Sequence, residues 1–313
     1  MSSIEEAAMK KQKINSIELF RIFVVVCVFM RHFAPKPVSG LIINGSNIFF
    51  IIAGFFLYGV AEKVRESNLS IGDYIGRRFG RIAMPLFFAL ILAASIGMFS
   101  WTRLPVSLSM APELLINMHP MGGTWYVFAL FWAQILLFGI LTKMQRDKAL
   151  FVIGILGAAA CYALVAGNGL ESIDKASLGF ANDGMLRGIF GASLGVLVGC
   201  AADRFNPTQI AGRKKAMVSA AELGLLALFV CNHLSGERTQ IAELSDVIIF
   251  AWLLFMMAAN RGYMAAILNR QNWLAKISRY VYPAYVLQYI MMNLTRAILH
   301  SHSLFWRPVE IIV

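Results

Sequence analysis

The chain has 313 residues, of which 58% are hydrophobic and only 14% are charged, and its mean hydropathy is +0.67. A soluble core of this size does not need so many apolar residues, so the composition excludes a soluble enzyme and predicts an all-α integral membrane protein. We attribute most of the net charge of +11 to basic residues that gather in cytoplasmic loops, and nucleic-acid binding is not expected.

Apolar segments that are long enough to cross a bilayer follow one another along the whole chain. In chain order they are Ile17–Phe33, Leu41–Val60, Ile82–Ser100, Thr124–Leu141, Ala149–Ala166, Gly184–Ala201, Ala216–Cys231, Val247–Asn260 and Val281–Leu299. A further helix could begin in Leu304–Val313. We therefore expect a polytopic bundle of about nine to ten transmembrane helices. Because the loops are too short for a second folded unit, residues 1–313 are expected to form a single transmembrane domain.

The positions of Lys and Arg predict the orientation of the chain. When residues 1–13 are placed in the cytoplasm as an N-terminal tail, most basic loop residues fall on the cytoplasmic side, as the positive-inside rule requires. The segment Ile17–Phe33 follows lysines, as a signal peptide would, but no small-residue cleavage pattern comes after it. We therefore interpret this segment as the first transmembrane helix, with a cytoplasmic N-terminus.

Arg21 and His32 lie inside this first segment. An arginine at the centre of a membrane segment costs about 2.5 to 3.5 kcal/mol on insertion scales, so such residues usually serve a function. The eleven-residue step to His32 is about three helical turns plus 20°, which puts both side chains on one face about 16 Å apart. Glu18 lies one turn before Arg21 on that face and can form an ion pair with it.

Small residues and cysteines in the predicted spans favour helix packing. Glycines recur at three- and four-residue steps, at positions 184, 188, 191, 195 and 199, which predicts the close approach of another helix of the same chain. The cysteines, Cys27, Cys161, Cys200 and Cys231, lie in or at the ends of spans without paired spacing. We expect them to be packing thiols.

Five stretches of the chain, taken in order, resemble motifs of the acyltransferase-3 family of membrane-bound acyltransferases. They are Glu18–Arg21 with His32 and Phe33, Asn47–Leu57, Tyr74–Pro85, Gly123–Val127, and Ile277–Tyr280 with Tyr285–Gln288. The resemblance covers nearly the whole chain, although the middle third matches only in hydrophobicity. Ala53 stands where the family commonly has serine, Asn47 where an acidic residue is frequent, and Gln288 where histidine is usual. No proton-transfer role is therefore assigned to these three residues.

Because the family modifies surface polysaccharides and related acceptors, the resemblance implies an integral-membrane O-acyltransferase of a bacterial inner membrane. The expected donor is acyl-CoA, with acetyl-CoA as the co-substrate, and no tightly bound cofactor or metal is expected. The expected acceptor is a hydroxyl group of a surface glycan or a lipid-linked sugar. The identity of the acceptor, the acyl group and the oligomeric state, a homo-oligomer included, stay open.

His32 is the expected general base. Acyl transfer from a thioester to an alcohol needs a group that takes the hydroxyl proton. An imidazole with an ordinary pKa of about 6.5 is mostly neutral near pH 7 and can do so. On position alone, His32 could instead cap a helix end near the headgroups, but Arg21 and the neighbouring motifs favour the base. Direct attack by the hydroxyl and a transient acyl-histidine both stay open.

Arg77, Arg78 and Arg81 stand at the entrance to the third span. Topology alone explains basic residues at a cytoplasmic helix end, but guanidinium groups also match the phosphate oxygens of coenzyme A. The family resemblance favours Arg78 and Arg81, which share one helix face. The hypothesis is that coenzyme A binds there from the cytoplasm. Its pantetheine arm then passes Arg21, which Glu18 orients, so that the thioester reaches His32.

Aromatic and histidine residues near the outer side have weaker functional signals. Trp125 and Tyr126 could form a platform for a sugar ring or belong to an interfacial aromatic belt. The loop Trp101–Gly123 is the longest on its side, and long loops are often functional. No role is assigned to the other histidines, because the ligands that a metal site would need are missing. They are His119, His233, His300 and His302.

Two other functional classes fit the same composition. A secondary transporter or exporter of a glycan precursor is also hydrophobic, and Arg21 and Glu18 could line its path. Transporters often contain internal repeats, and the sequence has no evident one, which favours the enzyme. The third alternative is an inactive structural relative, which Ala53 and Gln288 would suit.

Overall fold

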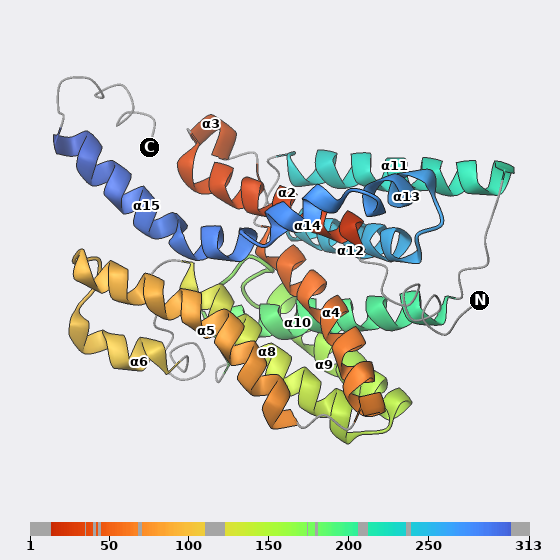
Figure 1. Cartoon of the computed structure of the whole chain (residues 1–313), viewed down its shortest axis with the longest axis horizontal. Coiled ribbons are helices and arrows are strands. Elements are labelled where there is room, and N and C mark those ends of the chain that lie inside the picture. The colour runs from red at the N-terminus through yellow and green to blue at the C-terminus, as the bar shows by residue number, and fades with distance from the viewer. Residues whose placement is uncertain are drawn as a thin grey trace.

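The computed structural model describes residues 14–34, 36–39, 42, 45–67, 71–109, 123–173, 175–178, 181–205, 212–235 and 239–301. The regular structure of this part of the chain is helical, without strands (Figure 1). Its elements are α2 (Asn15–Phe33), α3 (Lys36–Ser39), α4 (Ser46–Ser67), α5 (Ile71–Ser95), η1 (Trp101–Arg103), α6 (Leu104–Leu108), α8 (Thr124–Lys143), α9 (Arg146–Ala166), α10 (Asp183–Arg204), α11 (Gly212–His233), α12 (Gln240–Ala259), α13 (Tyr263–Asn269), α14 (Asn272–Ser278) and α15 (Val281–Ser301). The predicted tail 1–13, His119, His302 and the segment Leu304–Val313 lie outside the described residues.

Seven of the described helices are long and apolar enough to cross a membrane, namely α4, α5, α8, α9, α10, α11 and α12. They support a multi-pass membrane protein, but the expected number of nine to ten spans is not confirmed. Helices α2 and α15 have 19 and 21 residues and are not among the seven. In α2 the reason is its charge, because it contains Glu18, Arg21 and Arg31. The cytoplasmic position of the N-terminus stays a prediction.

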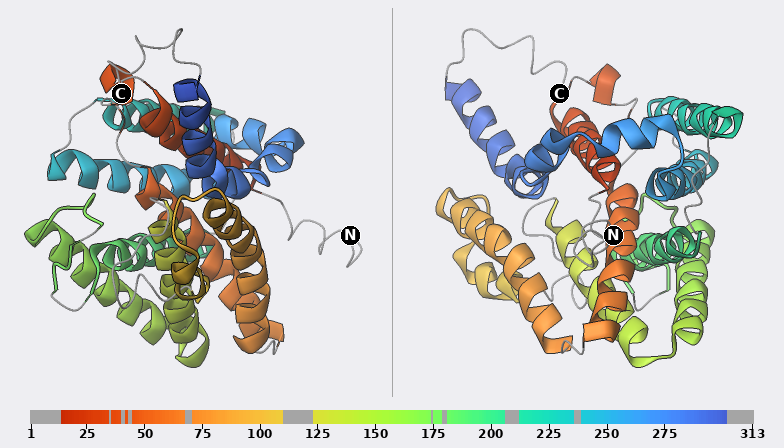
Figure 2. Two further views of the ribbon diagram at one scale, coloured as in Figure 1. Left: turned by 90° about the vertical axis from the view of Figure 1, so that its left-hand side faces the viewer. Right: turned by 45° about the vertical axis from the view of Figure 1, so that its right-hand side comes forward.

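Helix α10 packs against α4, α8, α9 and α12 (Figure 2). Its glycines allow close contacts with these helices. A Cβ atom at Gly54 of α4 would collide with the backbone of Ala192, and one at Gly195 of α10 with the carbonyl group of Ile51. The two helix backbones therefore touch at these points because one of the two helices has a glycine there. The prediction that the glycine stripe packs helices of the same chain together is confirmed.

Helix α2, which carries the predicted base, lies against α4, α12, α14 and α15. It buries apolar side chains such as Ile17, Phe20 and Val24 in the core. The first turn of α2 is fixed by Asn269, the last residue of α13. The Asn15 side chain donates to the Asn269 carbonyl group at 2.9 Å. The Ser16 N–H donates to the Asn269 side-chain oxygen at the same distance. The start of α2 is thus held by groups far away in the sequence.

Candidate active site

His32 lies in the last turn of α2 and is half-buried. The helix ends at Phe33, and Ala34 is extended, with its N–H still bound to the Met30 carbonyl group at 3.0 Å. The next residue is Pro35, and a residue before proline disfavours helical geometry, which explains why α2 stops there. The Nε2 atom of His32 lies 3.1 Å from the Tyr289 hydroxyl group of α15. The predicted base therefore has a polar partner that the sequence analysis did not identify.

Tyr289 belongs to a row of tyrosines on α15. Tyr282, Tyr285 and Tyr289 follow at steps of three and four residues and so share one helix face. The Tyr282 hydroxyl donates to the Ile82 carbonyl group of α5 at 2.6 Å, and the Tyr285 hydroxyl donates to the Gly123 carbonyl group at 3.1 Å. This face of α15 therefore binds α5, the start of α8 and α2. The spacing of the tyrosines was the sequence signal that could have revealed it.

A small pocket adjoins the contact between His32 and Tyr289. Its lining residues are Leu86, Gly123, Thr124, Val127, Tyr285, Val286 and Tyr289. Gly123 lets the Tyr289 ring come close to the start of α8, because a Cβ atom at this position would lie 2.6 Å from the ring. The pocket is apolar, and one of its walls is Tyr289, the residue whose hydroxyl group contacts the imidazole.

The predicted pair of Glu18 and Arg21 is confirmed. The Arg21 guanidinium group lies 3.2 Å from the Glu18 carboxylate, with side chains that are 39% and 15% exposed. The Arg21 guanidinium group also lies over the Phe56 ring of α4, 5.6 Å from its centroid. Arg21 is therefore a cation with a carboxylate on one side, an aromatic face on another, and part of its surface open.

Arg78 reaches the same neighbourhood from α5. It is half-buried, whereas Arg81 is exposed. Arg21 and Arg78 both lie close enough to the Tyr126 hydroxyl group to act on it by charge. Arg21 and Arg78 are thus both within electrostatic range of Tyr126, in the first turn of α8. The side chain of Arg77 lies outside the described part of the structure.

Trp125 and Tyr126 are core residues, with exposed fractions of 4% and 5%. The Tyr126 ring packs against Phe50 and Tyr285, with centroid distances of 4.6 and 5.3 Å. The Trp125 ring faces the guanidinium group of Arg187, 4.9 Å from its centroid. Both rings are therefore covered by protein, and their role as a sugar platform stays a prediction.

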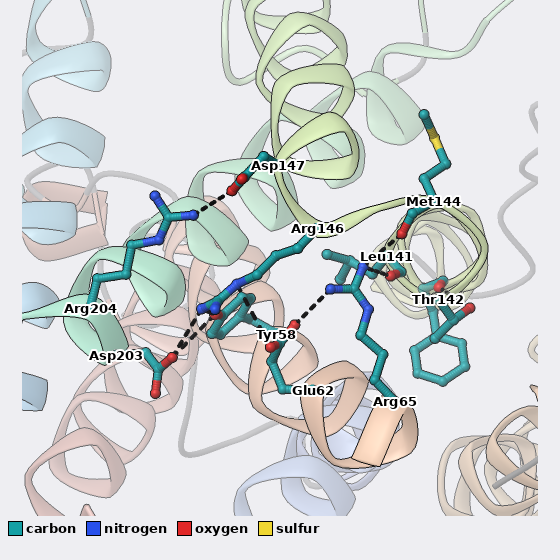
Figure 3. Close-up of polar contacts among 11 residues, drawn as sticks. Tyr58, Glu62, Arg65, Leu141, Thr142, Met144, Arg146, Asp147, Asp203 and Arg204 are labelled. Carbon is teal, nitrogen blue, oxygen red and sulfur yellow. Dashed lines mark hydrogen bonds and ion pairs between the residues drawn. The ribbon is translucent and has the colours of Figure 1, made fainter. Parts of the chain in front are cut away.

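A second polar cluster lies where α4, α8, α9 and α10 meet (Figure 3). Arg146 pairs with Asp203 at 3.1 Å and with Glu62 at 3.7 Å, while Arg65 pairs with Glu62 and donates to carbonyl groups at the end of α8. Carboxylates and a side-chain or backbone oxygen thus already bind the guanidinium groups of Arg65 and Arg146. The cluster fixes the turn between α8 and α9 and is not arranged to hold phosphate groups.

A family model described as an acyltransferase domain matches residues 14–313. No curated protein and no solved structure matches the chain.

Proposed function

The chain belongs to the acyltransferase-3 family of membrane acyltransferases, and from this premise we propose that it is an acyl-CoA-dependent O-acyltransferase with His32 as its general base. The expected acyl group is acetyl, and the acceptor is a hydroxyl group of a surface glycan or a lipid-linked sugar. The observation that carries this proposal is the contact of His32 with Tyr289 beside the pocket of α8 and α15. The same proposal places the chain in the inner membrane of a bacterium.

The reaction needs two proton transfers, to His32 and from it, and the exchange of one bond. His32 takes the proton of the acceptor hydroxyl as its oxygen attacks the acyl carbon of the thioester. The new carbon–oxygen bond forms, the carbon–sulfur bond breaks, and the proton passes from His32 to the leaving sulfur, so that coenzyme A departs as a thiol. A transient acyl-histidine would use the same atoms in two steps.

Arg78 and Arg81, with Arg77 beside them in sequence, are the proposed grip on the phosphate groups of coenzyme A. Guanidinium groups bind phosphate oxygens two at a time, and the spacing of Arg78 and Arg81 puts them on one face of α5. Arg21 and Arg78 both interact electrostatically with Tyr126, and Arg21 pairs with Glu18 at 3.2 Å. The proposed donor path runs from α5 past Arg21, with Glu18 orienting Arg21.

On the acceptor side, Trp125 and Tyr126 begin α8 next to Gly123 and Thr124, which line the pocket. Their aromatic surfaces support a sugar-binding role only if a substrate displaces the neighbours that cover them. We therefore assign Trp125 and Tyr126 to the wall of the acceptor site. If a substrate displaces their neighbours, a sugar ring can stack directly on them.

The test uses the full chain in membranes, radiolabelled acetyl-CoA and extracted glycan or lipid-linked sugar. Both labelled product and free thiol of coenzyme A are measured. His32→Gln, which keeps a polar side chain but has no base, and Arg21→Ala are compared with Arg204→Ala, which removes an exposed ion pair remote from the site.

We expect His32→Gln to lower the rate by at least about 100-fold, the usual contribution of a general base, and Arg204→Ala to leave it unchanged. Transfer by His32→Gln at the wild-type rate would remove the assigned base. A folded wild-type chain that neither labels these acceptors nor releases thiol would contradict the proposed function itself.

A further inference from the structure

Arg187 is the largest of the fully buried side chains in the described part of the chain, although it carries a charge. It lies in the second turn of α10, and its Nε atom donates to the Asn47 side-chain oxygen at 3.0 Å. One terminal nitrogen donates to the Ser46 hydroxyl group at 2.5 Å, and the other donates to the Glu171 carbonyl group at 3.0 Å. The ring of Trp125 covers the guanidinium plane. A buried arginine is costly in a membrane segment, so its position indicates a function.

The partners of Arg187 lead to the predicted base. Glu171, whose carbonyl group binds Arg187, offers its carboxylate to Arg31 at 3.1 Å. Arg31 also donates to the Ile42 carbonyl group and directly precedes His32 in the last turn of α2. Two arginines therefore hold the two ends of Glu171, one through its backbone and one through its side chain. Through this residue, the start of α10 is connected to the turn that carries His32.

A further acidic residue lies near this connection. Glu243 of α12 is buried, with an exposed fraction of 6%, and it interacts electrostatically with Arg187 and Glu171. The Arg31 and Glu171 side chains are 20% and 19% exposed. Removing the charge of Arg31 therefore leaves the partly buried Glu171 carboxylate without its ion-pair partner.

We propose that Arg187 is a positioning residue for His32, which acts through Glu171 and Arg31 to fix the last turn of α2 relative to Tyr289. The inference deepens the proposed function and rests on it for its kinetic consequences. A general base must stay within hydrogen-bond reach of the proton that it takes, and a misplacement of about 1 Å can cost about 100-fold in rate. A residue that holds the imidazole in place can therefore control the rate without touching a substrate.

The experiment compares Arg187→Gln, Arg187→Lys, Arg31→Gln and the double variant Arg187→Gln/Arg31→Gln in the full chain. The control is Arg204→Gln, because Arg204 forms an exposed ion pair with Asp147 and contacts none of these residues. The kinetic readout is kcat and the Michaelis constant for acetyl-CoA. A second readout is the rate at which diethyl pyrocarbonate modifies His32, followed by mass spectrometry, which needs no activity.

For Arg187→Gln we expect kcat to fall about 100-fold, with the Michaelis constant for acetyl-CoA within twofold of wild type. The modification rate of His32 should change several-fold in the same variant and stay unchanged in Arg204→Gln. Because both arginines act through Glu171, the double variant should lose little more than the stronger single one. Arg187→Lys keeps the charge but not the planar fork, and we expect an intermediate kcat in a chain that remains folded.

Three results would overturn the proposal. The first is a folded Arg187→Gln or Arg187→Lys chain with wild-type kcat and wild-type modification of His32. The second is a loss in the double variant equal to the product of the single losses, because independent sites would behave in that way. The third is a rate of His32 modification in Arg187→Gln that equals the rate in the control, Arg204→Gln. If the wild-type chain transfers no acyl group at all, the proposed function fails, while the modification experiment still decides the connection to His32.

Discussion

The hydroxyl group of Tyr289 lies 3.1 Å from Nε2 of His32, and the two rings are 5.1 Å apart at an angle of 59°. These residues come from the two ends of the described chain, since α2 is its first helix and α15 its last. Tyr289 also borders the pocket next to Gly123, so this contact joins α2 to a wall of the pocket. The orientation of the imidazole thus depends on the docking of α15 against α2.

Replacing Tyr289 with Phe removes this contact and keeps the ring that fills the space. We expect kcat to fall about 10- to 100-fold, because the imidazole loses the partner that orients it, while the Michaelis constant for acetyl-CoA stays unchanged. Tyr282→Phe is the matched control, since Tyr282 shares the helix face but binds the carbonyl group of Ile82 instead. Equal kcat losses in both variants would show that the effect belongs to helix docking and not to His32.

The proposed phosphate grip predicts a loss that depends on the donor. Arg78→Gln and Arg81→Gln should each raise the Michaelis constant for acetyl-CoA about tenfold, since a charge-assisted hydrogen bond contributes about 1.5 kcal/mol or more. The same variants should handle acetyl-pantetheine, which lacks the nucleotide phosphates, as the wild-type chain does. Arg270→Gln, at an exposed arginine between α13 and α14, is the control. An equal effect on both donors would contradict the assignment.

Features that depend on neighbours along the chain could be predicted from the sequence. The apolar run Ile17–Phe33 corresponds to α2, Asn15–Phe33, and Thr124–Leu141 corresponds to α8, Thr124–Lys143. The pair of Glu18 and Arg21 follows from a single turn of helix. The short helices α13 and α14 were not predicted, because helices of seven residues are too short to give the hydrophobic signal of a transmembrane segment.

Contacts between distant helices could not be predicted in this way. Tyr289 and His32 are 257 positions apart, and Arg187 and Asn47 are 140 positions apart, so no local periodicity relates them. The positive-inside pattern assigns no role to Arg187, although an arginine within an apolar span such as Gly184–Ala201 indicates function. Only the packing of α10 against α4 shows that Arg187 is enclosed by polar groups of its own chain.

The contact between α4 and α10 predicts which glycines tolerate a methyl group. Gly54→Ala or Gly195→Ala would push a Cβ atom into the backbone of the other helix, so we expect a loss of about 1 to 3 kcal/mol or a chain that fails to fold. Gly139→Ala and Gly154→Ala have no atom within 4 Å of the new Cβ and should stabilise their helices by up to about 1 kcal/mol. Thermal unfolding in detergent measures both pairs. Indistinguishable stabilities of the two pairs would contradict the packing described here.

Two polar pairs of similar length predict different sensitivities because their burial differs. His233 and Asp246 lie 2.9 Å apart with side chains 0% and 4% exposed, whereas Arg204 and Asp147 lie 2.6 Å apart with side chains 55% and 86% exposed. Asp246→Asn replaces the carboxylate in a buried hydrogen bond, so it should cost about 1 to 3 kcal/mol. Water screens the exposed pair, so Asp147→Asn should cost no more than about 1 kcal/mol. Unfolding in detergent at several salt concentrations checks this, since only the exposed pair should weaken as salt is added. A loss in Asp147→Asn as large as that in Asp246→Asn would mean that distance, and not burial, determines the contribution of these pairs.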